Sequence, residues 1–300
     1  MSGRRAPASL ETISVDVPES ALEFYEAALA SVCATVGFFR DHAASDWRVE
    51  GVKRVGSDEQ ILAAALALAG NLSGTEAEVR RALTPSDGWL ARSYADFPEQ
   101  RIGQRFAVRG THLRGPRLPG RITLTLDAGL AFGSGEHGST RGCLRALERV
   151  SRRRPRHILD LGTGSGILAM AAARLLRRPV LATDIDPWSV RVAQRNAKLN
   201  GLGRLTRILS ADGWRDRTIR RRAPYDLVFA NILARPLCLM AKQLGIHIKP
   251  GGVAILSGLL RGQARGVIAA HMRCGLRVES STQEGPWTTL SMRRPDWRKR

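Results

Sequence analysis

The second half of the chain alternates short apolar runs with longer amphipathic segments. The apolar runs begin at Ile158 and recur at 179–184, 205–209, 225–230 and 251–258. Helical patterns separate them, and strands that alternate with helices indicate a parallel sheet covered by helices. Residues 275–294 depart from this alternation and predict two short strands around a Gly-Pro turn, a hairpin that closes one edge of the sheet.

The first hundred residues follow a different pattern, in which strands and helices are mixed. It predicts a strand at 11–17, a helix at 19–32, strands at 34–41 and 46–55, and a helix at 58–72. This order indicates a small α+β domain of ferredoxin-like type.

A segment rich in glycine and proline, residues 111–121, lies between the two patterns and precedes a predicted strand at 122–127. Such a composition is typical of a loop or linker. We therefore expect a first domain at 1–109, a linker at 110–125 and a second domain at 126–300. Catalysis is expected in the second domain and substrate capture in the first.

The stretch ILDLGTGSGILAMAA, residues 158–172, predicts a strand that turns sharply into a helix. Its three glycines, among them Gly162 and Gly164, allow a ligand to approach the main chain closely. A dinucleotide is disfavoured, because Ile167 replaces the last glycine of the G-x-G-x-x-G pattern and Asp160 precedes the loop. A carboxylate at this place suits a ligand that carries positive charge.

A second acidic residue closes the next predicted strand. Asp184 follows Gly162 by 22 residues, about the spacing at which a carboxylate on the neighbouring strand accepts hydrogen bonds from ribose hydroxyls. The next helix is expected to begin at Pro187 with Asp186 as its N-cap. Asp184 is therefore available for a ligand.

Composition limits the class of protein. The chain has 300 residues, 43% of them hydrophobic, and its longest apolar stretch, at 61–70, is too short to span a membrane. The four cysteines lie far apart with no Cys-x-x-Cys pair, so neither a zinc site nor a disulfide framework is expected. The N-terminal segment lacks the apolar core of a signal peptide, and we expect a cytoplasmic protein.

The charge is strongly positive. Forty-seven Lys and Arg residues against 27 Asp and Glu residues give a formal net charge of +20. Arginine clusters at 152–156, 215–222 and 293–300 would suit RNA or a ribosomal particle. Surface arginine also serves solubility, and no RNA-binding signature with interleaved aromatic residues accompanies the clusters, so direct RNA binding stays open.

The stretch LDAGLAFGSGEHGSTRGCL, residues 126–144, precedes the glycine loop. It resembles the GLAFGTGxHxTT element of the PrmA family, class I methyltransferases that act on a protein of the large ribosomal subunit. The segments DLGTGSGILA, DIDPWSV and ANILARPL match the same family in order and spacing. The chain departs from the family at Ser134 and Ser139, where threonine is usual, and at Gly138, where proline is frequent.

The resemblance implies a Rossmann-like class I methyltransferase sheet and the cofactor S-adenosylmethionine, which carries an ammonium and a sulfonium. It assigns cofactor contacts to Thr140, Gly162 and Asp184. We also expect Gly164 to bind the cofactor, because it belongs to the glycine pattern, and Asp160, because its carboxylate suits a positively charged ligand.

Asn231 corresponds to the asparagine of the family's ANIL element and is expected to contact the cofactor and to be catalytic. It ends a strand at the carboxyl edge of the sheet, where open α/β sheets bind ligands. In many amine and amide methyltransferases an Asn/Asp-Pro-Pro-Tyr/Phe motif there aligns the nucleophilic nitrogen with the methyl group. Residues 231–234 lack the aromatic residue that would stack on a flat base, which favours a flexible amine. A helix N-cap is the alternative role for Asn231.

The predicted reaction is direct displacement at the methyl carbon by an uncharged amine, driven by alignment in a water-poor site. His137 could accept a proton, but a single histidine in a glycine loop is more often structural, so the general base stays open.

These observations predict a protein N-methyltransferase. Its substrates would be the N-terminal amine or lysines of a large-subunit ribosomal protein, with the first domain as the recognition module and the arginine surface as a candidate contact for ribosomal RNA. Two alternatives remain. An RNA base N-methyltransferase would carry the aromatic residue that 231–234 lack, and a non-catalytic ribosome-associated binding module would not need a full cofactor site.

Overall fold

A computed structural model of the chain describes residues 10–33, 35–39, 46–84, 99–111, 113, 115–126 and 137–296. The chain divides into two compact units, Met1–Trp89 and Leu90–Arg300. None of the helices in the described ranges combines the length and the apolar character that crossing a bilayer requires.

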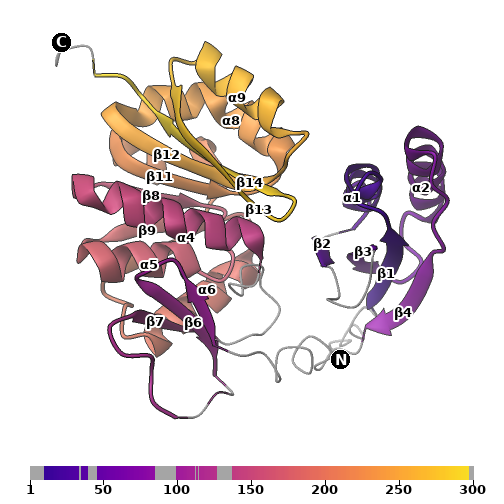
Figure 1. The fold of residues 1–300 in the computed structure, drawn as a ribbon, viewed down its shortest axis with the longest axis horizontal. Coiled ribbons are helices and arrows are strands. Elements are labelled where there is room, and N and C mark those ends of the chain that lie inside the picture. The colour runs from indigo at the N-terminus through magenta and orange to yellow at the C-terminus, as the bar shows by residue number, and fades with distance from the viewer. Residues whose placement is uncertain are drawn as a thin grey trace, which may run out of the picture. The chain divides into compact units, whose positions relative to one another are not determined.

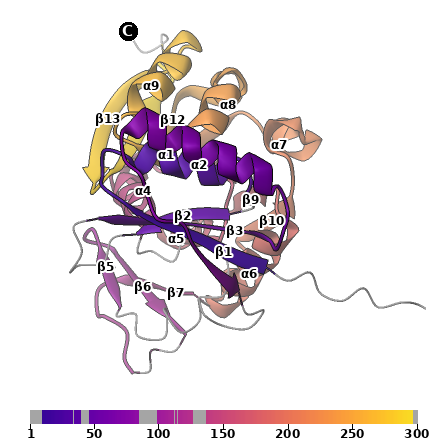
Figure 2. The ribbon, with the colours of Figure 1, turned by 90° about the vertical axis from the view of Figure 1, so that its right-hand side faces the viewer.

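The first unit is a four-stranded antiparallel sheet with two helices. Its elements are β1 (Leu10–Val17), α1 (Leu22–Ala30), β2 (Thr35–Phe39), β3 (Trp47–Arg54), α2 (Glu59–Ser73) and β4 (Arg80–Thr84). The strand order β2-β3-β1-β4 confirms the ferredoxin-like arrangement. Both helices lie on one face of this sheet (Figure 2), where alternate residues of β1 (Ile13, Val15, Val17) are buried.

The second unit contains a seven-stranded sheet (Figure 1). Its elements are α4 (Gly138–Val150), η1 (Ser151–Arg153), β8 (Ile158–Leu161), α5 (Ile167–Leu176), β9 (Val180–Asp184), α6 (Pro187–Leu199), β10 (Thr206–Ser210), η2 (Gly213–Arg215), α7 (Arg217–Arg221), β11 (Tyr225–Asn231), α8 (Ala234–His247), β12 (Ile248–Leu260), α9 (Ala264–Arg273), β13 (Arg277–Glu284) and β14 (Trp287–Arg293). The strand order is β10-β9-β8-β11-β12-β14-β13. The five strands from β8 to β12 are parallel, and β14 runs antiparallel to both of its neighbours, which confirms the predicted parallel sheet and terminal hairpin.

The central strands are buried on both faces, as their nearly continuous apolar sequence predicts. On β11, Leu227 and Phe229 belong to the core beneath α4, α5 and α6. Val228 and Ala230 belong to a second core, beneath α7, α8 and α9. Burial on both faces fixes the position of the strand ends, and so of the side chains that follow them.

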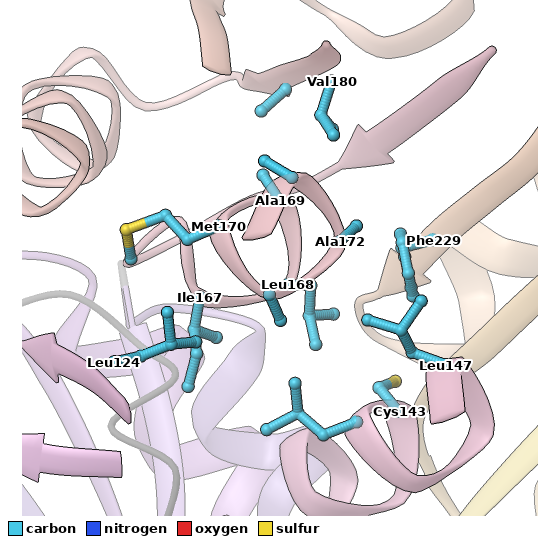
Figure 3. Close-up of a cluster of buried hydrophobic side chains, with 14 of the residues drawn as sticks. Leu124, Cys143, Leu147, Ile167, Leu168, Ala169, Met170, Ala172, Val180 and Phe229 are labelled. Atoms are coloured by element: carbon cyan, nitrogen blue, oxygen red, sulfur yellow. The ribbon is translucent and has the colours of Figure 1, made fainter. Parts of the chain in front are cut away.

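A second, three-stranded sheet belongs to the same unit. It consists of β5 (Gln100–Ile102), β6 (Phe106–Gly110) and β7 (Ile122–Leu126), with β6 and β7 parallel. Its apolar residues join the core that α4 and α5 form, and Figure 3 draws Leu124 of β7 in that core with Ile167 and Met170 of α5. The amide of Asn200, after α6, also makes two hydrogen bonds with the backbone of Thr125, accepting from its N–H (2.8 Å) and donating to its carbonyl (2.6 Å).

The division into compact units differs from the boundaries expected from the sequence. The second unit begins at Leu90, whereas we placed residues up to 109 in the first domain and 110–125 in a linker. The glycines and prolines of that segment connect two paired strands, and buried Arg109 holds the connection by donating to the carbonyl of Leu113 (2.6 Å). A loop between paired strands and a linker between domains are both rich in glycine and proline, so composition alone does not distinguish them.

Substitution of Gly142 in α4 tests how closely this helix packs on β14. A Cβ at Gly142 would overlap Oγ1 of Thr289, whereas a Cβ at Gly266 in α9 would meet nothing within 4 Å. We expect Gly142→Ala to lower the free energy of unfolding by about 1 to 3 kcal/mol through overpacking. Gly266→Ala, the matched control, should raise it by about 0.5 to 1 kcal/mol because alanine favours the helix. Urea denaturation measures both, and stabilisation by both substitutions would contradict the close packing.

Candidate functional site

The glycine loop between β8 and α5 lies at the carboxyl edge of the parallel sheet. Gly162 has a φ of +67°, a conformation that L side chains rarely adopt. A Cβ at Gly162 would overlap Cγ2 of Ile232, the residue that follows Asn231. The loop therefore packs directly against the end of β11, and Gly162 cannot be replaced without moving one of them.

Asp160 lies beneath this loop and is fully buried. Its Oδ2 accepts hydrogen bonds from Oγ1 of Thr163 (2.6 Å) and from the N–H of Ala169 (3.1 Å), so it joins the loop to the first turn of α5. Its Oδ1 is buried with no hydrogen-bond partner among the described residues. Burial raises the pKa of this carboxyl to about 7, against the lowering effect of the two hydrogen bonds.

Asp184 stands at the end of β9, beside β8. Its Oδ2 accepts a hydrogen bond from the N–H of Gly164 (2.9 Å), and its Oδ1 accepts one from the N–H of Asp186 (3.1 Å). The N-cap of α6 is Asp186, as predicted, and it accepts hydrogen bonds from the N–H groups of Trp188 and Ser189. Asp184 therefore does not cap α6 but fixes the glycine loop to the neighbouring strand.

Asn231 and Thr140 come together although 91 residues separate them. Asn231 ends β11, and its Nδ2 donates a hydrogen bond to Oγ1 of Thr140, in the first turn of α4, at 3.4 Å. Thr140 is fully buried and Asn231 is 9% exposed. Oδ1 of Asn231 is buried with no partner in the described part of the chain, which leaves an acceptor at this edge of the sheet.

The start of α4 is held against the β13–β14 hairpin. The ring of His137, at the N-cap position, lies 4.0 Å from the ring of Trp287, centroid to centroid. Its Nδ1 is 2.7 Å from Oγ of Ser139. Burial lowers the pKa of His137 to about 3, so this imidazole is neutral at physiological pH and is a weak base.

The structure thus brings the six predicted site residues to one edge of the sheet, at the ends of β8, β9 and β11 and the start of α4. Sequence reasoning missed the residues that support them, Ile232 against the glycine loop and Trp287 beneath His137, because neither has a sequence signal that distinguishes it from ordinary core. Residues 127–136, which include Ser134 of the family element, lie outside the described residues.

The arrangement fits a cationic cofactor with a ribose. Two carboxyl groups, Asp160 and Asp184, stand near the ends of neighbouring strands, and Oδ1 of Asp160 and Oδ1 of Asn231 have no hydrogen-bond partner among the described residues. The glycine loop presents main chain where a side chain would block a ligand. No group of three or more His, Cys, Asp or Glu side chains suited to a metal ion occurs in the described ranges.

Comparisons with known proteins agree with this geometry. Residues 37–295 match the family described as ribosomal protein L11 methyltransferase (PrmA). The ribosomal protein L11 methyltransferase of Chelativorans sp. is 45% identical over 218 residues, 72% of this chain and 75% of that protein. That of Mesorhizobium japonicum is 47% identical over 217 residues, 72% of this chain and 74% of that protein.

A solved structure leads to the same family. The crystal structure of the ribosomal protein L11 methylase from Lactobacillus delbrueckii subsp. bulgaricus superposes with a TM-score of 0.61 at 30% identity, over 66% of this chain and all of that one. The chain therefore belongs to the ribosomal protein L11 methyltransferase (PrmA) family.

Proposed function

We propose that the chain transfers methyl groups from S-adenosylmethionine to amino groups of ribosomal protein L11, on its N-terminal amine, its lysines or both. The observation that carries the proposal is the buried Oδ1 of Asn231, which accepts no hydrogen bond from any described residue and is held beside Thr140 at the edge where Asp184 fixes the glycine loop. The names of the relatives support the protein substrate.

The cofactor would be held by the two carboxyl groups and the glycine loop. Asp184 ends the strand next to the loop, where a carboxylate accepts hydrogen bonds from ribose hydroxyls. Negative charge at Asp160 would be favoured by a cationic ligand, because an opposite charge stabilises the ionised form of a buried carboxyl. When bound, the cofactor supplies the electrophilic methyl group.

Asn231 would position the acceptor nitrogen. Its Oδ1 can accept a hydrogen bond from an amine N–H, while its Nδ2 stays with Thr140. An amine attacks only when it is uncharged, and His137 is too weak a base at neutral pH to keep a proton that the amine loses. The amine would therefore release its proton to water, and alignment would supply the rate enhancement.

The two compact units suggest a division of labour. The unit Met1–Trp89 would recognise the ribosomal protein, and the unit Leu90–Arg300 would carry out methyl transfer. A ribosomal substrate also accounts for the positive charge of +20 through contact with ribosomal RNA, and for a cytoplasmic setting.

Incubation with labelled cofactor and a ribosomal extract tests the substrate class. We expect the label in a protein of the size of L11. Label in RNA would support the RNA base methyltransferase alternative, and no transfer to any component would support the non-catalytic alternative.

Asp184→Ala should weaken S-adenosylmethionine binding by about 1.5 to 3 kcal/mol, the scale of hydrogen bonds to a charged group. Asp226→Ala is the matched control, because Asp226 accepts hydrogen bonds from two backbone N–H groups, of Arg156 and His157, at the start of β8, away from the carboxyl edge. Calorimetric titration should show unchanged affinity in the control. Equal losses in the two variants would mean that Asp184 acts only through the stability of the fold.

Substitution of Asn231 should reduce turnover more than cofactor affinity. Asn231→Ala removes a positioning contact and should lower kcat about 10²-fold. Asn231→Asp keeps the acceptor and the size but adds a negative charge that stabilises the ammonium form of the acceptor, so its activity should recover as the pH rises. A pH profile of Asn231→Asp that coincides with that of the wild type would show that the nitrogen is held elsewhere.

A protein that starts at Leu90 should bind the cofactor with wild-type affinity but lose most methylation of L11. The truncation keeps β5 and β6, whose side chains belong to the core of the second unit. Calorimetry and label incorporation measure the two properties on the same sample. Methylation at the wild-type rate would contradict the recognition role of the first unit.

A further inference from the structure

A depression of about 420 Å³ lies between the β5–β6 turn and the C-terminal half of α4. Its charged lining consists of Arg105, Arg145, Arg149, Arg152 and Glu148. Arg145, Arg149 and Arg152 recur at intervals of four and three residues, so they follow one face of α4 into η1, with Arg105 on the turn beside them. Guanidinium groups from two separate segments thus converge on one concave surface.

The turn that carries Arg105 is fixed to the helix. Both carboxylate oxygens of Glu148 accept hydrogen bonds from the turn, from the N–H of Gln104 (3.2 Å) and the N–H of Arg105 (2.7 Å). Gly103 sits so close to this carboxylate that a Cβ there would overlap it. Arg121 donates to the carbonyl of Gly103 at 2.9 Å from the other side. Hydrogen bonds within the protein therefore hold the wall of the depression in place.

Among the described residues, only one of the four arginines of the depression makes an ion pair. Arg145 pairs with Glu284 at 2.8 Å. Within the described part of the chain, the other three arginines of the lining, Arg105, Arg149 and Arg152, have no carboxylate within ion-pair distance, and all three are exposed. The one acidic residue in the lining, Glu148, has both oxygens in hydrogen bonds to the turn. This is an arrangement that attracts an anion.

We infer that this depression, which we call the α4 arginine site, binds the phosphate backbone of RNA. The planar guanidinium matches phosphate oxygens in a two-bond geometry that a lysine cannot reproduce. The site continues along the chain into exposed Arg154 and Arg156, so neighbouring phosphates of a polyanion meet further positive charge. An acidic protein partner fits less well, because none of the described residues that line the depression has a large apolar or aromatic side chain to anchor it.

The lining also predicts how the RNA is recognised. The described residues of the lining include no aromatic side chain on which a base could stack. Contacts to phosphate alone carry no sequence information, so binding should be independent of sequence.

The α4 arginine site is separate from the site of methyl transfer. Thr140 and Arg149 stand nine residues apart on α4, roughly 14 Å along the helix axis. The phosphates bound at Arg149 would therefore lie away from the residues that hold the cofactor and the acceptor nitrogen. This inference rests on the proposed function, because it places the proposed contact with ribosomal RNA at the α4 arginine site.

The test compares two double variants of the full chain that lose the same charge. Arg149→Ala with Arg152→Ala removes two arginines of the site, and Arg217→Ala with Arg221→Ala removes two exposed arginines of α7 that line no part of it. Fluorescence anisotropy measures binding of a labelled 20-nucleotide single-stranded RNA of mixed sequence across a range of KCl concentrations. Two lost phosphate contacts should lower the slope of log affinity against log salt by about 1.4.

We expect the first variant to bind RNA at least about 10-fold more weakly at 0.15 M salt and the α7 variant to change by less than about twofold, with no dependence on RNA sequence. Equal losses in the two variants would overturn the site in favour of general electrostatics. The site would also be overturned if the wild type did not bind the RNA, or if it bound polyglutamate more tightly than the RNA. The same holds if inorganic pyrophosphate, at the same concentration of negative charge as the RNA, displaced the RNA completely. The anisotropy measurement needs no methyl acceptor, so its result does not depend on whether the proposed methyl transfer occurs.

Discussion

A carboxyl group buried beneath the turn between β8 and α5 determines the shape of the candidate site. Asp160 holds Thr163 and Ala169, and so fixes where the glycine loop leaves the sheet. From that position the loop reaches Asp184 through the N–H of Gly164, and Gly162 packs against the end of β11. A shift of Asp160 would be passed through these contacts to the end of every strand that borders the site.

Burial of this carboxyl is costly, and the cost is visible in its pKa of about 7. The nearby charge of Asp184 contributes to this raised pKa, since two like charges disfavour ionisation. This edge of the sheet therefore brings two acidic side chains close together, in a chain whose overall charge is +20. A cation at this edge would relieve the repulsion, which is the electrostatic reason why a sulfonium cofactor suits it better than a pyrophosphate.

The elements that the sequence predicted well are those whose signals are local. Asp186 before Pro187 marks a helix start, Gly285 before Pro286 marks a hairpin, and both are where the pattern placed them. Features that depend on contacts between distant segments were not predicted. Strands β5 and β6 are too short to show the alternation of apolar and polar residues that marks a strand. The arginines of the α4 site resemble ordinary surface charge in the sequence, because only the fold brings the β5–β6 turn beside the helix. Asp160 was predicted as a ligand contact, and its bonds to the loop were not foreseen.

Strand β14 lies between β12 and β13 although it follows both in the chain. While the polypeptide is being synthesised, β13 emerges before the strand that must separate it from β12 exists. The edge of β12 therefore stays open, with unpaired backbone groups, until Trp287–Arg293 has left the ribosome. The same segment carries Trp287 under His137, so the helix that presents Thr140 gains its full support only at that moment. A nascent chain of this fold would thus acquire its site last, after the sheet around it has been made.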